Sequence, residues 1–341
     1  MSNKIINNIR EKNRWNIFWY VLITGLALLA VLMLVSITKG AANLPYSEVL
    51  DAFLKFDKEN SKHLLVLDMR VPRVVSAALV GSALAISGAL MQGMTRNPMA
   101  DSGLMGLSSG AGLALAICLA YLSKLSYTNI IFITFFGAAF GAAAVYTISS
   151  LIPGANSPLK LVLAGATVST LFSALSQGIS IMGKISQNLF FWTMGSVSGT
   201  SWRQIMIAMP FMLAAMLAAF IISRKVTILS MGEEVATGLG VKTGGVKLIG
   251  TVLVVLLAGS SVALAGMISF VGIVVPHLSR FLVGADYRLI IPISAVLGAV
   301  LLVAADLGAK TFQPPVELPL GAIISLLGVP VFLYFARKEA R

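Results

Sequence analysis

The residues that could take part in chemistry are few, and the cations among them follow a pattern. Arg70 and Arg73 stand together just before one apolar run, and Lys310 stands at the end of another. Guanidinium and ammonium groups in such places can pair with carboxylates on a second protein, which would steer and orient that protein. The alternative is that these long side chains only extend from the apolar runs to water, as basic side chains commonly do.

Motifs for catalysis, metal binding and nucleotide binding are missing from the sequence. His63 and His277 are too far apart to suggest a metal site, and Cys118 is a single cysteine inside an apolar run. Neither an HExxH zinc motif nor a paired-carboxylate motif occurs. The pair Gly183-Lys184 is followed by isoleucine, so it is not a phosphate loop. We therefore expect no catalytic residue, no metal ligand and no cofactor in this chain.

The composition assigns the chain to the polytopic membrane proteins. Of its 341 residues, 57% are hydrophobic and 11% are charged, whereas a soluble domain carries roughly 25% charged residues. The net charge of +12 could suggest nucleic acid. The charges lie in the loops between apolar runs, however, so membrane topology explains them better and no nucleic-acid partner is expected.

Ten membrane-spanning helices are predicted, in an all-α fold with a single transmembrane domain over residues 1–341. The N-terminal run is interpreted as a retained span, because no clear cleavage site follows it. Both ends of the chain are basic and so are placed inside, which requires an even number of crossings. Nine spans are obvious, and parity makes the short run 269–284, broken by Pro276, the tenth. The predicted segments are span one at 15–37, an external segment at 38–73, spans two to six at 74–222, a cytoplasmic loop at 223–247 and spans seven to ten at 248–336.

The apolar runs hold almost no ionisable residue at mid-depth. Asp306 is the nearest candidate, and it lies close to the outer end of its span. A carrier driven by protons or sodium usually keeps such a residue, because a charge in hydrocarbon is costly and is retained only for function. With no coupling residue and no nucleotide site, we expect a partner protein to drive this chain.

The polar segment 223–247 is where such a partner would attach. It is long for a simple connector, and its residues 230–241 are predicted to form a short helix. Ser230 would be the N-cap, with Glu233 completing a capping box. The glycines that could end this helix are Gly238 and Gly240. The alternative is a solvated amphipathic connector.

A short internal sequence similarity, which we call the internal echo, indicates an inverted repeat. The segment Gly81–Gly88 matches Gly259–Gly266 in its glycine, serine and alanine spacing, and a proline follows each copy after ten residues, at Pro98 and Pro276. The first copy runs inward and the second outward, a pattern common in transporters. The alternative is that small residues recur because membrane helices pack closely through them.

Four long stretches resemble a known family. They are Arg70–Gly112, Gly232–Val241, Gly266–Arg288 and Glu317–Phe332. In these stretches the sequence resembles the permease subunits of the iron–siderophore branch of ATP-binding-cassette importers, the family that includes the cobalamin permease. The resemblance extends from about Arg70 to the end of the chain.

The resemblance implies partners and site residues. It implies ten helices per subunit and a dimer of permease chains around the pathway. Two ATPase subunits would lie beneath the cytoplasmic loop 223–247. It also implies an extracellular or periplasmic binding protein, whose glutamates would meet Arg70, Arg73 and Lys310. Arginine is usual at the last of these positions. Lysine keeps the charge but lacks the bidentate fork, which weakens this contact or indicates a second, different permease chain.

Two further sets of residues follow from the resemblance. The residues expected to couple to the ATPase are Met231, Gly232, Glu233, Glu234, Ala236, Gly238, Leu239 and Gly240. The residues expected to be structural or to take part in gating are Asn97, Pro98, Pro276, His277, Arg280 and Glu317. We interpret His277 as a structural residue that ends the short tenth span.

The expected function is import of a ferric siderophore across the bacterial cytoplasmic membrane, with a hydroxamate such as ferrichrome favoured. ATP and Mg²⁺ would be bound by the partner ATPase. The alternatives are a permease for cobalamin or haem and an ion-coupled secondary transporter. The choice between a homodimer and a heterodimer stays open at this point.

Overall fold

The computed structural model describes the chain except residues 1, 41–42, 123, 152–157, 315 and 340–341. The sequence Pro-Gly-Ala-Asn-Ser-Pro at 153–158 predicts an inner turn, which lies largely outside the described residues, as does the end of the basic tail. Every named element of the described part is a helix. Its helices are α1 (Ser2–Thr38), α2 (Tyr46–Leu54), α3 (Ser61–Leu64), η1 (Leu65–Arg70), α4 (Val71–Thr95), η2 (Ser102–Met105), α5 (Leu107–Tyr121), α6 (Tyr127–Leu151), α7 (Pro158–Met182), α8 (Ser186–Thr193), α9 (Trp202–Ser230), α10 (Glu233–Gly238), α11 (Thr243–Ala265), α12 (Val271–Val283), α13 (Tyr287–Thr311) and α14 (Leu320–Glu339).

Helix length and composition support a multi-pass membrane fold. Among the described residues, seven helices are long and apolar enough to cross a bilayer. Three shorter apolar helices, Leu107–Tyr121, Val271–Val283 and Leu320–Leu333, account for the other predicted spans. The all-helical prediction is confirmed, whereas the total of ten crossings stays a prediction.

The bundle is built around α4, whose middle is almost entirely buried. Helices α9, α11, α12 and α13 pack against it, while α5, α6 and α7 form a neighbouring group. Glycine allows the closest of these contacts. A Cβ atom at Gly88 would lie 1.9 Å from the Gly272 carbonyl oxygen of α12, and one at Gly81 would lie 2.2 Å from the Gly298 carbonyl oxygen of α13.

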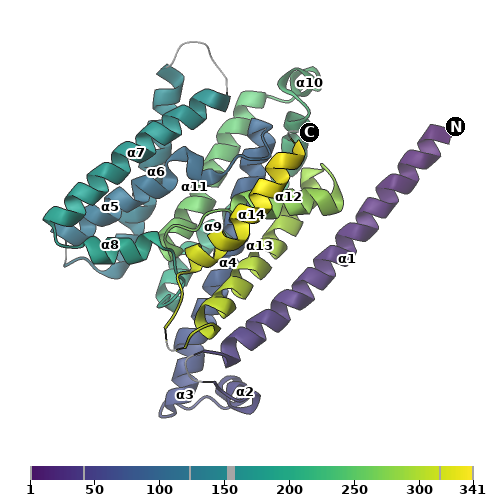
Figure 1. Cartoon of the computed structure of the whole chain (residues 1–341). Helices are drawn as coiled ribbons and strands as arrows, with labels where there is room; N and C mark the ends of the chain where they lie inside the picture. Colours follow the sequence, from purple (N-terminus) through teal and green to yellow (C-terminus); the bar gives the residue numbers. More distant parts are fainter. Residues whose placement is uncertain (1, 41–42, 123, 152–157, 315, 340–341) are drawn as a thin grey trace.

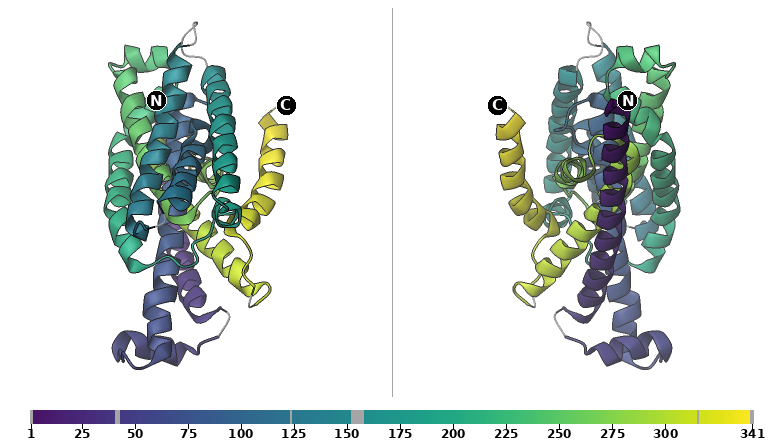
Figure 2. Two further views of the ribbon diagram at one scale, coloured as in Figure 1. Left: turned by 90° about the vertical axis from the view of Figure 1, so that its left-hand side faces the viewer. Right: turned by 90° about the vertical axis from the view of Figure 1, so that its right-hand side faces the viewer.

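The bundle has two distinct ends. The short helices α2, α3 and η1 project beyond one end, which we call the α2 end, and α10 lies at the opposite α10 end (Figure 1; Figure 2). Helix α1 begins and α14 ends toward the α10 end (Figure 1). The side of the membrane that each terminus faces stays a prediction.

Two helix ends add detail that the sequence pattern does not give. Helix α9 continues to Ser230, so the polar segment begins inside a helix and the connection proper is shorter. The two copies of the internal echo also occupy different places. Gly81–Gly88 lies within α4, whereas Gly259–Gly266 runs past the end of α11, where Gly266 has a φ of 70°. A match of eight small residues does not determine where a helix ends.

Helix breaks follow the proline signals only in part. Helix α4 ends at Thr95, just before Asn97-Pro98, and Arg96 takes the left-handed conformation that ends many helices. The side chain of Asn97 then accepts a hydrogen bond from the Met99 amide at 2.9 Å. By contrast, Pro276 lies inside an unbroken α12.

Candidate functional sites

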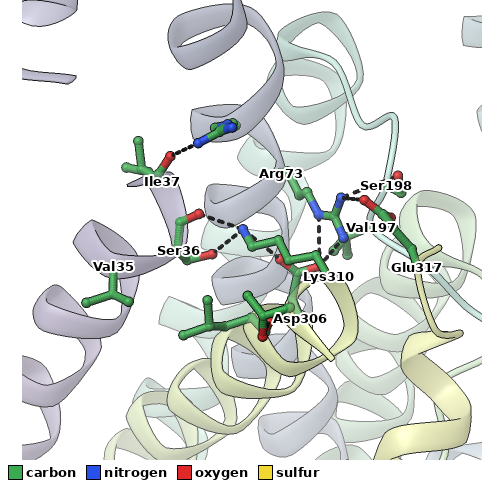
Figure 3. Close-up of polar contacts among 12 residues, drawn as sticks. Val35, Ser36, Ile37, Arg73, Val197, Ser198, Asp306, Lys310 and Glu317 are labelled. Atoms are coloured by element: carbon green, nitrogen blue, oxygen red, sulfur yellow. Dashed lines mark hydrogen bonds and ion pairs between the residues drawn. The ribbon is translucent and has the colours of Figure 1, made fainter. Parts of the chain in front are cut away.

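Three cations and two carboxylates meet at the α2 end. Arg70 ends η1, Arg73 lies in the first turn of α4, and Lys310 lies in the last turn of α13. Asp306, one turn before Lys310, and Glu317, between α13 and α14, complete this group (Figure 3). We call these five residues the charge cluster. It borders a pocket of about 390 Å³ that Ser198 and Thr200 also line.

Arg70 and Lys310 hold the C-terminal end of α1. Arg70 donates hydrogen bonds to the Ile37 and Thr38 carbonyl oxygens at 2.7 and 3.0 Å. The Lys310 ammonium donates to the carbonyl and hydroxyl oxygens of Ser36 at 2.6 and 2.7 Å (Figure 3). The last carbonyls of a helix lack partners within it and carry partial negative charge, so cations stabilise that end.

Two of the three cations are buried by the chain itself. Arg70 is 8% exposed and Lys310 is 4% exposed, so most of each side chain is covered by the chain itself. The pattern of cations at the ends of apolar runs was identified correctly, but the partners are carbonyl groups that no local sequence signal indicates. Any partner protein that binds here meets these two cations already engaged.

Arg73 holds two carboxylates at once. Its Nε donates to Asp306 Oδ1 at 2.9 Å, and its Nη1 donates to Glu317 Oε1 at 2.7 Å (Figure 3). The planar fork of a guanidinium allows this, because its N–H groups point in fixed and separate directions. Burial opposes ionisation of Glu317, but the hydrogen bond and charge of Arg73 outweigh it. The pKa of Glu317 therefore lies below its ordinary value.

Asp306 is a shared counter-ion. Its carboxylate lies between Arg73 and Lys310, with Oδ2 at 3.7 Å from the Lys310 ammonium, and its side chain is only 2% exposed. That spacing makes an ion pair without a hydrogen bond, and Oδ2 has no other partner in the described residues. The charge cluster thus holds one positive charge in excess at the α2 end.

Helix α10 is the short helix predicted in the polar segment. Its N-cap is Gly232, with a φ of 128°, so the proposed cap at Ser230 is wrong. Ser230 instead ends α9 and donates its hydroxyl to the Thr227 carbonyl at 2.7 Å. Gly240, with a φ of 77°, allows the turn that follows α10, as predicted.

One ion pair and one apolar row, on α10 and the residues that flank it, mark this end of the bundle. Glu233 pairs with Lys247 of α11 at 2.5 Å, and this hydrogen bond is the main cause that lowers the pKa of Glu233. Met231, Val235 and Leu239 follow one another at a spacing of four residues and are 64%, 48% and 63% exposed. An exposed row of this kind suits a groove in a partner protein.

A polar network lies between α10 and the centre of the bundle. The Thr227 hydroxyl of α9 donates to Asp286 at 3.2 Å and accepts from the Tyr287 amide at 2.9 Å. Arg280 of α12 donates to Tyr287 Oη at 3.0 Å and to Gln92 Oε1 at 3.1 Å. The network therefore links α9, α13, α12 and α4 through side chains.

His277 is wrongly placed by the sequence analysis. It was expected to end the short span, but it lies in the middle of α12 and is half-buried. Within the residues that the structure describes, no group of three or more histidine, cysteine, aspartate or glutamate side chains could hold a metal ion.

Comparison with known proteins decides the family. The model described as the FecCD transport family matches residues 28–338. The chain belongs to the FecCD transport family. It is 43% identical over 344 aligned residues to the iron(3+)-hydroxamate import system permease protein FhuB of Bacillus subtilis (strain 168), covering 100% of this chain and 90% of that protein.

A second relative carries a different name. The hemin transport system permease protein HmuU of Yersinia pestis is 35% identical over 318 residues, covering 92% of this chain and 94% of that protein. A solved structure described as an inward-facing conformation of a metal-chelate type ABC transporter has a TM-score of 0.82 and 26% identity. It covers 94% of this chain and 99% of that chain. The permease fold is therefore shared along nearly the full length.

The sequence of this FecCD permease did not predict several residues of the charge cluster and the polar network. Asp306 was noticed only as an ionisable group, although its spacing of four residues from Lys310 was a usable signal. Gln92, Thr227 and Tyr287 carry no local signal, because their partners lie on other helices. Of the predicted residues, the structure brings four together at the α2 end: Arg70, Arg73, Lys310 and Glu317. Their order in the sequence does not indicate this proximity.

Proposed function

We propose that this chain is the permease subunit of an ATP-driven importer that carries a ferric siderophore of the hydroxamate type across the bacterial cytoplasmic membrane. The observation that carries the proposal is the 43% identity, over the whole chain, to a relative named as an iron(3+)-hydroxamate permease. Haem is the second candidate cargo, supported by the lower identity of 35% to the hemin permease.

The α2 end is proposed to receive a binding protein that delivers the chelate. A pocket with an excess of positive charge favours approach of carboxylates on that protein. Arg73 is the proposed contact because its guanidinium reaches the more exposed carboxylate, Glu317. Arg70 and Lys310 are proposed to support it by fixing the end of α1.

The α10 end is proposed to face the cytoplasm and to dock two ATPase subunits, one under each of two permease chains. The basic residues near both termini support this orientation. The exposed row of Met231, Val235 and Leu239 would enter a groove of the ATPase. ATP hydrolysis belongs to that partner, because this sequence contains no phosphate loop.

Motion of α10 is proposed to reach the pathway through the polar network. Helix α10 follows α9 directly, and Thr227 of α9 contacts Asp286 and Tyr287 at the start of α13. The iron would stay inside its chelate during passage, so the permease is proposed to need neither metal ligands nor a cofactor of its own.

ATP-dependent uptake in proteoliposomes tests the proposal. The chain is reconstituted with its ATPase and binding protein and is offered labelled ferric hydroxamates, haem and cobalamin. Saturable uptake of a ferric hydroxamate, with this chain as the only permease present, supports both the cargo and a homodimer. Recovery of uptake only after a second permease chain is added indicates a heterodimer. Uptake that needs no ATPase and collapses with an uncoupler would contradict the proposal.

A further inference from the structure

The two carboxylates on Arg73 differ in how firmly they are held. Asp306 belongs to α13, and its side chain is 2% exposed, so it is fixed by the packing around it. Glu317 lies in the non-helical connection between α13 and α14, and its side chain is 41% exposed. Water reaches the Glu317 carboxylate but hardly reaches Asp306, so the bond between Arg73 and Glu317 is the easier of the two to open.

The positions of these carboxylates relative to the pocket also differ. Glu317 lines the pocket at the α2 end together with Arg73 and Ser198, whereas Asp306 does not line it. The Arg73 Nη1 atom that Glu317 occupies is therefore the part of the guanidinium nearest to an incoming group. A carboxylate that entered the pocket would compete with Glu317 for this atom and would leave the Asp306 contact intact.

We propose that Glu317 is an internal substitute for a carboxylate of the docking protein, and that docking exchanges one for the other on Arg73. Asp306 is a positioning residue that holds the guanidinium plane during the exchange. This inference rests on the proposed function, since it requires a binding protein at the α2 end. The ion pair between Arg73 and Glu317 then weakens docking, because it must open before the partner's carboxylate can bind.

The test measures the dissociation constant of the binding protein with which the reconstituted transporter takes up its chelate. Glu317→Gln keeps the shape of the side chain and removes its charge. We expect it to tighten binding about three- to fivefold, the size of an ion pair in which one partner is reached by water. The matched control is Glu48→Gln, whose carboxylate pairs with Lys62 at 3.0 Å outside the pocket. This control should leave the constant unchanged.

A double-mutant cycle separates exchange on Arg73 from a general loss of negative charge. If the carboxylates compete for Arg73, Glu317→Gln does not tighten binding of the binding protein when Arg73→Gln is already present. Should Arg73→Gln fail to fold, Arg73→Lys replaces it, because lysine keeps a charge beside Asp306 but lacks the fork that reaches Glu317.

The outcomes separate this inference from the proposed function. Weaker or unchanged binding in Glu317→Gln overturns the inference, and so does a gain that persists beside Arg73→Gln. If Arg73→Gln alone leaves binding unchanged, the proposed docking site is wrong and the inference is overturned with it. If Arg73→Gln weakens binding and Glu317→Gln does not tighten it, only the inference is overturned.

Discussion

At the scale of single residues, Gln92 explains how a proline is accepted inside α12. Pro276 has no N–H group, so the carbonyl oxygen four residues earlier, on Gly272, loses its helical partner. The buried Gln92 side chain donates to that oxygen at 3.2 Å and to the Ile273 carbonyl at 3.3 Å. Within a membrane bundle such replacement matters, because water is not there to satisfy the carbonyl.

Replacing this amide should destabilise the fold. We expect Gln92→Leu to lower the free energy of unfolding by about 1–3 kcal/mol, since it leaves the Gly272 carbonyl and one Arg280 donor without a partner. Thermal unfolding of the purified chain in detergent measures the change. Gln177→Leu, on an exposed face of α7, is the matched control and should behave like the natural chain. Equal midpoints for all three chains would contradict the assigned role of Gln92.

At the scale of elements, α10 depends on an ion pair to a neighbouring helix. The helix has only six residues, and its N-cap is Gly232, which has no side chain that could cap it. The pair between Glu233 and Lys247 therefore holds its first turn against α11. The lowered pKa of Glu233 means that this pair stabilises α10 above the ordinary pKa of a glutamate. The stabilisation is lost as the pH falls through the lowered value.

Removing the lysine should restore the ordinary titration of this glutamate. We expect Lys247→Met to raise the pKa of Glu233, because the largest cause of its lowering is the hydrogen bond from Lys247. A titration of the labelled Glu233 side chain by carbon-13 NMR measures this. Lys242→Met, in the same connection but outside the pair, should leave the titration unchanged. A curve that does not move in Lys247→Met would show that another group sets the pKa.

At the scale of the whole molecule, the two ends present different groups. The charge cluster and the projecting helices α2 and α3 lie at one end, and α10 with its apolar row lies at the other (Figure 1). An importer needs this separation, because the cargo arrives on one side of the membrane and the energy on the other.

Labelling of single cysteines tests the orientation. In a Cys118→Ala background, Lys55→Cys near α2 should react with a membrane-impermeant maleimide added to intact bacterial cells. Leu239→Cys beside α10 should react only after the cells are made permeable. Both positions are exposed, so access to the reagent depends on the side of the membrane. Reaction of Leu239→Cys alone in intact cells would reverse the proposed orientation.

The sequence by itself determined the class of this protein, the approximate spans and the short helix between α9 and α11. These features depend on the length of an apolar run and on local breaks such as Asn97-Pro98, which neighbouring residues specify. Only the tertiary structure decided the partners of the cations. Arg73 meets carboxylates 233 and 244 residues away, and Lys310 meets a carbonyl 274 residues away. Such pairs form where packed helices bring distant residues together, and no local pattern in the chain specifies them.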